Sequence, residues 1–276
     1  VNAGTGSSLT ITNSTVSGNT ANNSGGGILN ANTATLTIIN STVSGNTAKY
    51  GGGVINGSTV TLINSTVSGN SASVNGGGLY NPSGYTINLK NTIIANSTSG
   101  SDCVNSGTLG DDVNNLIESH SGCGTPVSTT DPNLSALADN GGPTQTHALN
   151  SPSDAIDNGD ATTCAALTYD QRGAPRTINS TCDIGAFEFG GTPTYVELVT
   201  GKASYSSSLG GTLLEWETAM ELNNSHFVIL KSGTASGTFQ AIAVVDFDGN
   251  DLTDGLRIFA KGDGSSYNVL DPNVNA

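Results

Sequence analysis

The chain has few charged residues, since Asp, Glu, Lys and Arg make up only 11% of its 276 residues. Charge-driven disorder needs low hydrophobicity together with dense like charge, and the second condition is missing. Basic residues are scarce, because Lys49 and Lys90 are the only two before Arg172. Nucleic acids and acidic membrane surfaces bind clustered Lys and Arg, so neither is an expected partner. The net charge of −14 indicates a soluble protein with some attraction for divalent cations.

Long apolar runs and helical patterns of useful length are also absent. No segment is long enough to insert into a bilayer, and none has the form of a signal peptide. The chain starts at Val1 inside repetitive sequence, so we expect a mature or trimmed chain whose targeting segment lies outside it. Gly, Ser, Thr and Asn are abundant instead, with β-branched residues in short alternating runs. This composition predicts an all-β protein.

One motif recurs four times in the first hundred residues. It reads LTITNSTVSGNTA from Leu9, LTIINSTVSGNTA from Leu36, VTLINSTVSGNSA from Val60 and, one residue shorter, INLKNTIIANS from Ile87. The aligned asparagines are spaced 27, 24 and 27 residues apart and are Asn13, Asn40, Asn64 and Asn91. Three consecutive glycines follow each of the first three copies.

A repeat of this length has few physical solutions. A leucine-rich repeat would need a leucine framework and a helical segment, whereas three short strands and three turns fit the spacing. The apolar residues alternate, so each strand points one face into a narrow core. We therefore predict a right-handed parallel β-helix whose equivalent residues stack about 4.8 Å apart. At its corners we expect glycines with positive φ, and asparagines in left-handed turns with amides hydrogen-bonded along the stack, rather than a carbohydrate or ion site.

Four cysteines allow three disulfide pairings, and they are Cys103, Cys123, Cys164 and Cys182. Pairing neighbours in sequence would close loops of about twenty residues at the far end of the β-helix. A metal site would need close Cys or His pairs, which the sequence lacks. We expect structural disulfides and hence an oxidising, extracellular compartment.

A series of motifs occupies residues 102 to 189. It comprises DPNL from Asp131, DNGGPT from Asp139, HAL from His147, SP from Ser151, AID from Ala155, DQRG from Asp170, Arg176, and CDIGAFE from Cys182. In this order and spacing the series resembles the segment that ends bacterial surface proteins of the choice-of-anchor Q domain family. The resemblance implies a pectate-lyase-like β-helix that is secreted or held at the cell surface. It implies no activity, because the family is defined by architecture.

Two arginines of this segment, Arg172 and Arg176, accompany two acids, Asp170 and Asp183. The forked guanidinium group suits pairing with carboxylates. We expect both acids to pair with the arginines and to hold the final coils. A lyase-type base or a sugar contact is the alternative.

The last part of the chain differs in composition, with Trp216 and most of the lysines. Its motifs LLEWETA from Leu213 and ELNNSHFVI from Glu221 resemble fibronectin-type-III-like or immunoglobulin-like modules of secreted bacterial proteins. We predict a β-helix domain over residues 1–190 and a small β-sandwich over residues 191–276, with Trp216 in its core. Such modules normally continue with further strands, so the sandwich is expected to be incomplete.

An acidic turn in this module concentrates oxygen ligands of the kind that calcium prefers. Its residues are Asp246, Asp248, Asn250, Asp251 and Asp254. An EF-hand is excluded, because it would need Gly at Asp251 and an acid at Arg257. We name the turn as a candidate calcium site; an ordinary solvated loop is the alternative, and no other cofactor is expected.

Three functional classes follow. An incomplete sandwich and an uncapped first coil favour a structural protein that assembles head-to-tail with its own copies, with strand donation, into an extracellular filament. Loss of both ends by proteolysis, cloning or disorder is the alternative explanation. The second class is a surface adhesin that binds glycans.

The third class is a polysaccharide lyase or glycoside hydrolase, which would need suitably placed acids. The candidate clusters are Asp111 with Asp112, and Asp154 with Asp157 and Asp160. The second cluster lies among Pro, Asn and Gly, which is turn chemistry. The first 101 residues contain no acid, and the regular coils have few aromatic residues for stacking on sugars. We therefore expect no enzyme activity.

Overall fold

The computed structural model describes residues 1–177 and 181–193 and, beyond them, the backbone of strands β18 to β23. The chain divides into two compact units, Val1–Pro193 and Thr194–Ala276. Each unit is described by itself. The division falls close to residue 190, where the composition of the sequence changes.

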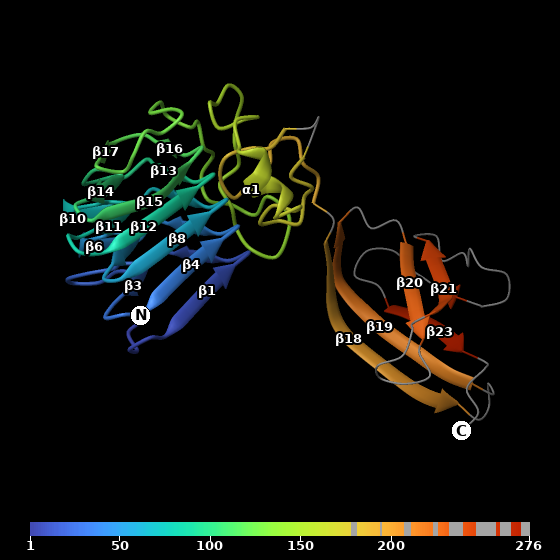
Figure 1. Ribbon diagram of the computed structural model, residues 1–276. Helices are drawn as coiled ribbons and strands as arrows, with labels where there is room; N and C mark the ends of the chain where they lie inside the picture. The colour runs from blue at the N-terminus through green and yellow to red at the C-terminus, as the bar shows by residue number, and fades with distance from the viewer. Residues whose placement is uncertain are drawn as a thin grey trace. The chain divides into compact units, whose positions relative to one another are not determined.

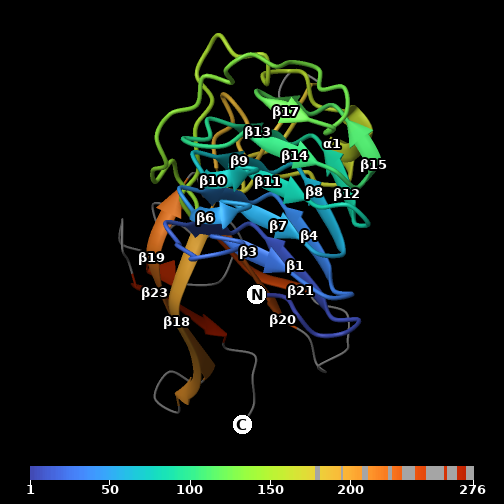
Figure 2. The same ribbon diagram turned by 90° about the vertical axis from the view of Figure 1, so that its left-hand side faces the viewer.

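The first unit is a stack of coils that forms three parallel sheets of five strands each (Figures 1 and 2). Sheet 1 contains β1 (Ser8–Thr12), β4 (Thr35–Ile39), β8 (Thr59–Ile63), β12 (Thr86–Lys90) and β15 (Thr108–Val113). Sheet 2 contains β2 (Thr15–Ser17), β5 (Thr42–Ser44), β9 (Thr66–Ser68), β13 (Ile93–Ala95) and β16 (Leu116–Ile117). Sheet 3 contains β3 (Ile28–Asn30), β7 (Val54–Asn56), β11 (Leu79–Asn81), β14 (Cys103–Asn105) and β17 (His120–Ser121). A further parallel pair joins β6 (Thr47–Tyr50) to β10 (Ser71–Asn75).

The motif repeat sets the register of the sheets. Val60 in β8 pairs with Leu36 in β4 on one side and with Ile87 in β12 on the other. All three side chains are fully buried in the central core. Burying such a side chain contributes roughly 1.5–3 kcal/mol to folding. The prediction of a parallel β-solenoid is therefore confirmed.

The glycine triplets lie where a neighbouring coil leaves no room for a side chain. A β-carbon on Gly52 would lie 2.3 Å from the backbone oxygen of Ser71 and 2.5 Å from that of Gly77. Such contacts are far inside van der Waals distance, so no larger residue fits without moving a neighbouring coil. The first glycine of the same triplet, Gly51, has φ of 59°, which L-residues with a β-carbon rarely adopt.

Residues 122–193, which we call the closing segment, leave the repeat after β17. Their described part contains one short helix, α1 (Ala161–Ala165), which begins at Asp160 because that carboxylate accepts the amide proton of Thr163. In Figure 1 this yellow-green segment lies at the side of the solenoid toward which the arrows of β1, β4 and β8 point. It therefore faces the corner between sheets 1 and 2.

The described strands of the second unit are all antiparallel. One sheet has the order β18 (Tyr195–Ser206), β19 (Gly211–Leu222), β23 (Ser266–Asp271) and β22 (Ile258–Phe259). A second pair joins β20 (His226–Lys231) to β21 (Gln240–Asp246). The resemblance to a fibronectin-type-III or immunoglobulin-like module remains a prediction.

Candidate functional site

The closing segment packs along sheet 2 and covers its outward face. Thr42 in β5 donates a hydrogen bond to the Gln171 side chain over 2.6 Å, and Thr66 in β9 accepts the amide of Ala186 over 3.0 Å. Both threonines are buried, although they point away from the central core. A second apolar cluster continues this contact. It consists of Ile93, Ala95, Leu116, Leu149, Ala155 and Ile184. Strands β5, β9, β13 and β16 of sheet 2 are thereby buried and β2 is half-buried, whereas the outward face of sheet 1 remains partly accessible.

The four aligned asparagines do lie in left-handed turns, with φ between 46° and 49° for Asn13, Asn40, Asn64 and Asn91. Their side chains, however, do not form the expected ladder along the stack. Asn40 and Asn91 instead bond to the closing segment, through the carbonyl of Tyr169 and the backbone of Asp160. The side chain of Asn64 has no hydrogen-bond partner among the described residues. These asparagines therefore shape the corner, and two of them also hold the closing segment.

The amide ladder runs through other asparagines that sequence reasoning did not single out. Asn2, Asn30, Asn56, Asn81 and Asn105 are joined along sheet 3 by side-chain hydrogen bonds of 2.7 to 3.1 Å. A shorter ladder links Asn19, Asn46 and Asn70. The signal that could have found the first ladder is the Asn that follows each glycine triplet after two apolar residues.

Both disulfides join cysteines that are neighbours in sequence. Cys103 pairs with Cys123, and Cys164 pairs with Cys182, over separations of 20 and 18 residues. The first disulfide ties β14 to the start of the closing segment, and the second ties α1 to the last motif of that segment. The expectation of structural disulfides is confirmed, and it fits an oxidising compartment.

Arg172 and Asp170 form a buried, forked ion pair. The Nε and Nη2 atoms of Arg172 lie 2.9 and 2.7 Å from one carboxylate oxygen of Asp170. The same guanidinium lies 3.5 Å from the ring centre of Phe187 and donates to the carbonyl of Glu188. Asp170 also accepts the amides of Arg172 and Ala174. This pair fixes the turn of the closing segment, in line with the structural interpretation.

The expected pairing of Asp183 with an arginine needs correction. The carboxylate beside Arg176 belongs to Glu188, at 3.8 Å, while Asp183 accepts the backbone amides of Asp157 and Phe189. Arg176 is fully buried and bonds to the side chain of Asn40 and the carbonyl of Gly185. It therefore joins the closing segment to the solenoid. Glu188 lies in an apolar run, and nothing in the sequence marked it as a buried partner.

This buried cluster contains two guanidinium groups and three carboxyl groups. Burial, followed by the neighbouring Asp183 carboxylate, raises the pKa of Glu188 from 4.5 to about 8. Burial also raises the pKa of Asp183. The main cause of both shifts is the same, because burial disfavours the charged form of each carboxyl group.

A serine and a histidine that the sequence analysis did not predict also join the solenoid to the closing segment. Nε2 of His147 lies 2.8 Å from Oγ of Ser44 in β5, and its Nδ1 lies 2.7 Å from the carbonyl oxygen of Ser135. Because a carbonyl can only accept, Nδ1 carries the proton and Nε2 accepts the serine hydroxyl proton. Burial lowers the pKa of His147, which favours this neutral form.

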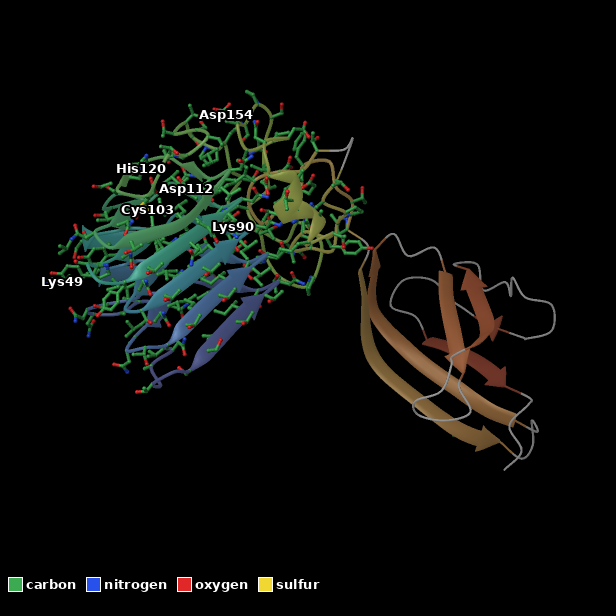
Figure 3. All side chains as sticks on the ribbon, viewed as in Figure 1. Lys49, Lys90, Cys103, Asp112, His120 and Asp154 are labelled. Atoms are coloured by element: carbon green, nitrogen blue, oxygen red, sulfur yellow. A yellow bond between two sulfur atoms is a disulfide. The ribbon has the colours of Figure 1, made fainter. Side chains whose placement is uncertain are left out.

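Each candidate catalytic acid makes its own structural contacts; Figure 3 labels two of these acids, Asp112 and Asp154. Asp111 forms an ion pair with Lys90 over 2.8 Å, and Asp112 accepts the amide of Thr125 and the side chain of Asn115. Asp154 lies in the loops of the closing segment, where the hydroxyls of Ser128 and Thr130 lower its pKa.

The other two acids of that cluster also have structural partners. Asp157 has φ of 59° and accepts the hydroxyl of Thr181. Asp160 caps α1, and the hydrogen bonds from Thr163 lower its pKa. Each acid thus stabilises its own turn.

The candidate calcium turn lies mostly outside the described residues. Asp246 ends β21, whereas Asp248, Asn250, Asp251 and Asp254 fall outside the described part of the chain. Trp216 lies in β19, opposite Tyr267 of β23, and its side chain is likewise outside the description. Within the described residues, no group of three or more His, Cys, Asp or Glu is placed to hold a metal ion. No helix in that part of the chain is long and apolar enough to span a membrane.

Comparison with known proteins gives one match. Residues 64–82 match the Chlamydia polymorphic membrane protein repeat. The matched stretch starts at the corner residue Asn64 and includes β9, β10, the glycine triplet and β11, which is most of one coil. No curated protein and no solved structure matches the chain. The match and the parallel solenoid together fit a β-helical surface protein.

Proposed function

We propose that this chain is a non-catalytic extracellular protein of a bacterial surface, in which the solenoid acts as a rigid structural element. The main support for the proposal is that the closing segment covers one sheet of the solenoid and leaves another exposed. The closing segment covers sheet 2, and its acids are engaged in capping, turns or ion pairs. Sheet 1 remains open, with an outward face of mostly Ser, Thr and Asn. A rigid, weakly charged face suits contact or spacing better than bond cleavage.

The location is supported by two independent features. The two disulfides require an oxidising compartment to form and persist. The matched repeat carries the name of a membrane protein of bacteria. Antibody labelling of intact cells, compared with permeabilised cells, tests this part of the proposal.

The enzyme alternative has a direct test. Incubation with a uronic-acid polymer and with neutral polysaccharides should release no reducing ends or unsaturated products. Product release that is lost in both Asp157→Asn and Asp160→Asn would contradict the proposal. Circular dichroism of both variants would show that the fold is retained.

Head-to-tail assembly into a filament is a second candidate. Its support is the parallel pairing of the coils, because the strands of one copy can pair with those of another in the way that neighbouring coils pair within the chain. Electron microscopy of the secreted material should then show filaments. Monomers at all concentrations would contradict the candidate. Strand donation by the second unit remains a further prediction.

A further inference from the structure

A cavity of about 260 Å³ lies between the solenoid and the closing segment. One wall comes from the corner after sheet 2, with Ser68, Gly69 and Asn96. The opposite wall comes from residues 131–136 and from His147 of the closing segment. This cavity is smaller than the roughly 300–1,000 Å³ of pockets for drug-sized ligands, so it suits a ligand of one ring.

The polar groups of the cavity have hydrogen-bonding capacity to spare. The Nδ2 atom of Asn96 lies 3.5 Å from Oγ of Ser68, at the limit of a hydrogen bond. Asp131 is exposed, and one of its oxygens accepts the amide of Asn133 over 2.8 Å. The amide offers both donors and an acceptor, the serine hydroxyl offers one of each, and the carboxylate offers acceptors. Such a mixture suits the hydroxyl groups of a sugar.

The walls are held in place before any ligand arrives. Asn96 and Asn133 both have φ of 58° or less in the left-handed region, which fixes the backbone beside the cavity. The Asn133 side chain donates to the carbonyls of Asn150 and Pro152, each over 3.2 Å. Both nitrogens of His147 are engaged, by Ser44 and Ser135. Preorganisation of this kind reduces the entropic cost of binding.

The lining also indicates the charge of the ligand. Burial favours the neutral form of His147, which contributes a ring surface, as Leu134 contributes apolar surface. The carboxylate of Glu118 accepts the amide of Asn96, and Asp131 lines the cavity itself. These two carboxylates repel a negatively charged ligand. A uronic acid or a sulfated sugar is therefore disfavoured relative to a neutral sugar.

We propose that this cavity binds one neutral pyranose unit of a surface glycan. The inference deepens the proposed surface role, since it names a ligand for a protein exposed outside the cell. The sugar hydroxyls would bond to Ser68, Asn96 and Asp131, while its apolar face would lie against Leu134 and His147. The binding site lies at the junction with the closing segment and not on the open sheet 1.

The test uses the full chain and saturation-transfer NMR with titration of methyl glycosides of glucose, galactose, N-acetylglucosamine and galacturonic acid. At least one neutral glycoside should bind at millimolar concentration, and the galacturonate should bind less well. Ala136→Trp, which fills the cavity, and Asn96→Gly, which removes the amide but keeps the left-handed turn, should each weaken binding about tenfold. Ala165→Trp on exposed α1 is the matched control and should bind like the unmodified chain.

Three results would overturn the inference: no neutral glycoside binds, the galacturonate binds as well as the neutral sugars, or Ala136→Trp and Ala165→Trp bind equally. Circular dichroism and melting temperature establish that each variant is folded. Failure of this inference is distinct from failure of the surface role, because a protein found inside cells would leave the NMR result unchanged.

Discussion

Replacing Asn56 by Ala tests the amide ladder that holds the coils of sheet 3 together. Asn56 is 1% exposed, and its Nδ2 atom donates to the Asn81 side chain over 2.8 Å and to the carbonyl of Thr86 over 2.9 Å. Its Oδ1 atom accepts the Asn30 amide and the backbone amide of Ser58. The substitution removes all these contacts without removing any apolar side chain from the core.

The expected loss of stability comes from the polar groups that lose a hydrogen-bond partner. Asn30 retains hydrogen bonds to the carbonyls of Ala34 and Thr59, so its amide remains satisfied. The Asn81 side-chain oxygen and the partly buried amide of Ser58 lose a partner. A buried polar group without a partner costs about 1–3 kcal/mol. We therefore expect Asn56→Ala to lower the free energy of unfolding by about 3 kcal/mol.

Chemical denaturation of the full chain, followed by far-UV circular dichroism, measures this change. Asn22→Ala is the matched control, since Asn22 is exposed and lies in a turn. It should change the free energy of unfolding by less than about 0.5 kcal/mol. If Asn56→Ala costs no more than Asn22→Ala, the ladder does not stabilise the solenoid and the reasoning fails.

Three further predictions concern the coil contacts, a disulfide and the buried charges. Gly52→Ala should lower the free energy of unfolding by about 3 kcal/mol, because the added β-carbon meets two backbone oxygens. In the control Gly18→Ala the β-carbon meets nothing within 4 Å, so the free energy of unfolding should fall by only about 1 kcal/mol. A denaturation titration measures both changes. Replacing Cys103 and Cys123 by Ser should lower the free energy of unfolding by about 3 kcal/mol. The double variant should also lose part of the effect that reducing agents have on the melting temperature. A melting temperature equal to that of the unmodified chain would contradict this prediction. Because the pKa of Glu188 is raised to about 8, its contribution to stability is complete below pH 4.5 and is lost as the pH rises toward 8. This group contributes a slope of at most about 1.4 kcal/mol per pH unit to the free energy of unfolding. Glu188→Gln should therefore flatten the fall in melting temperature between pH 5 and 8, and an equally steep fall in the variant would refute the assignment.

Much of the solenoid could be predicted because its determinants are local and repeated. The alternation around Leu36 and Val60 marks the buried face, and the spacing of Asn40 and Asn64 marks the corner. Both are properties of a few neighbouring residues. Stacking then follows, since coils with the same pattern can pair strand by strand in register.

The contacts of the closing segment could not be predicted in the same way. Gln171 bonds to Thr42, which is 129 positions away, and Glu188 lies beside the buried Arg176 of the same segment. The role of each therefore depends on how the segment packs. The amide ladder was assigned to the wrong asparagines for a related reason. Asn40 and Asn56 occur in equally regular positions, and only the fold places Asn56 in contact with the asparagines of the neighbouring coils.

Immunogold labelling of intact cells with an antibody against the solenoid tests whether the protein lies at the cell surface. Gold particles should decorate unpermeabilised cells or the material that they release, and external protease should remove the signal. Labelling that appears only after permeabilisation would contradict a surface role for this protein.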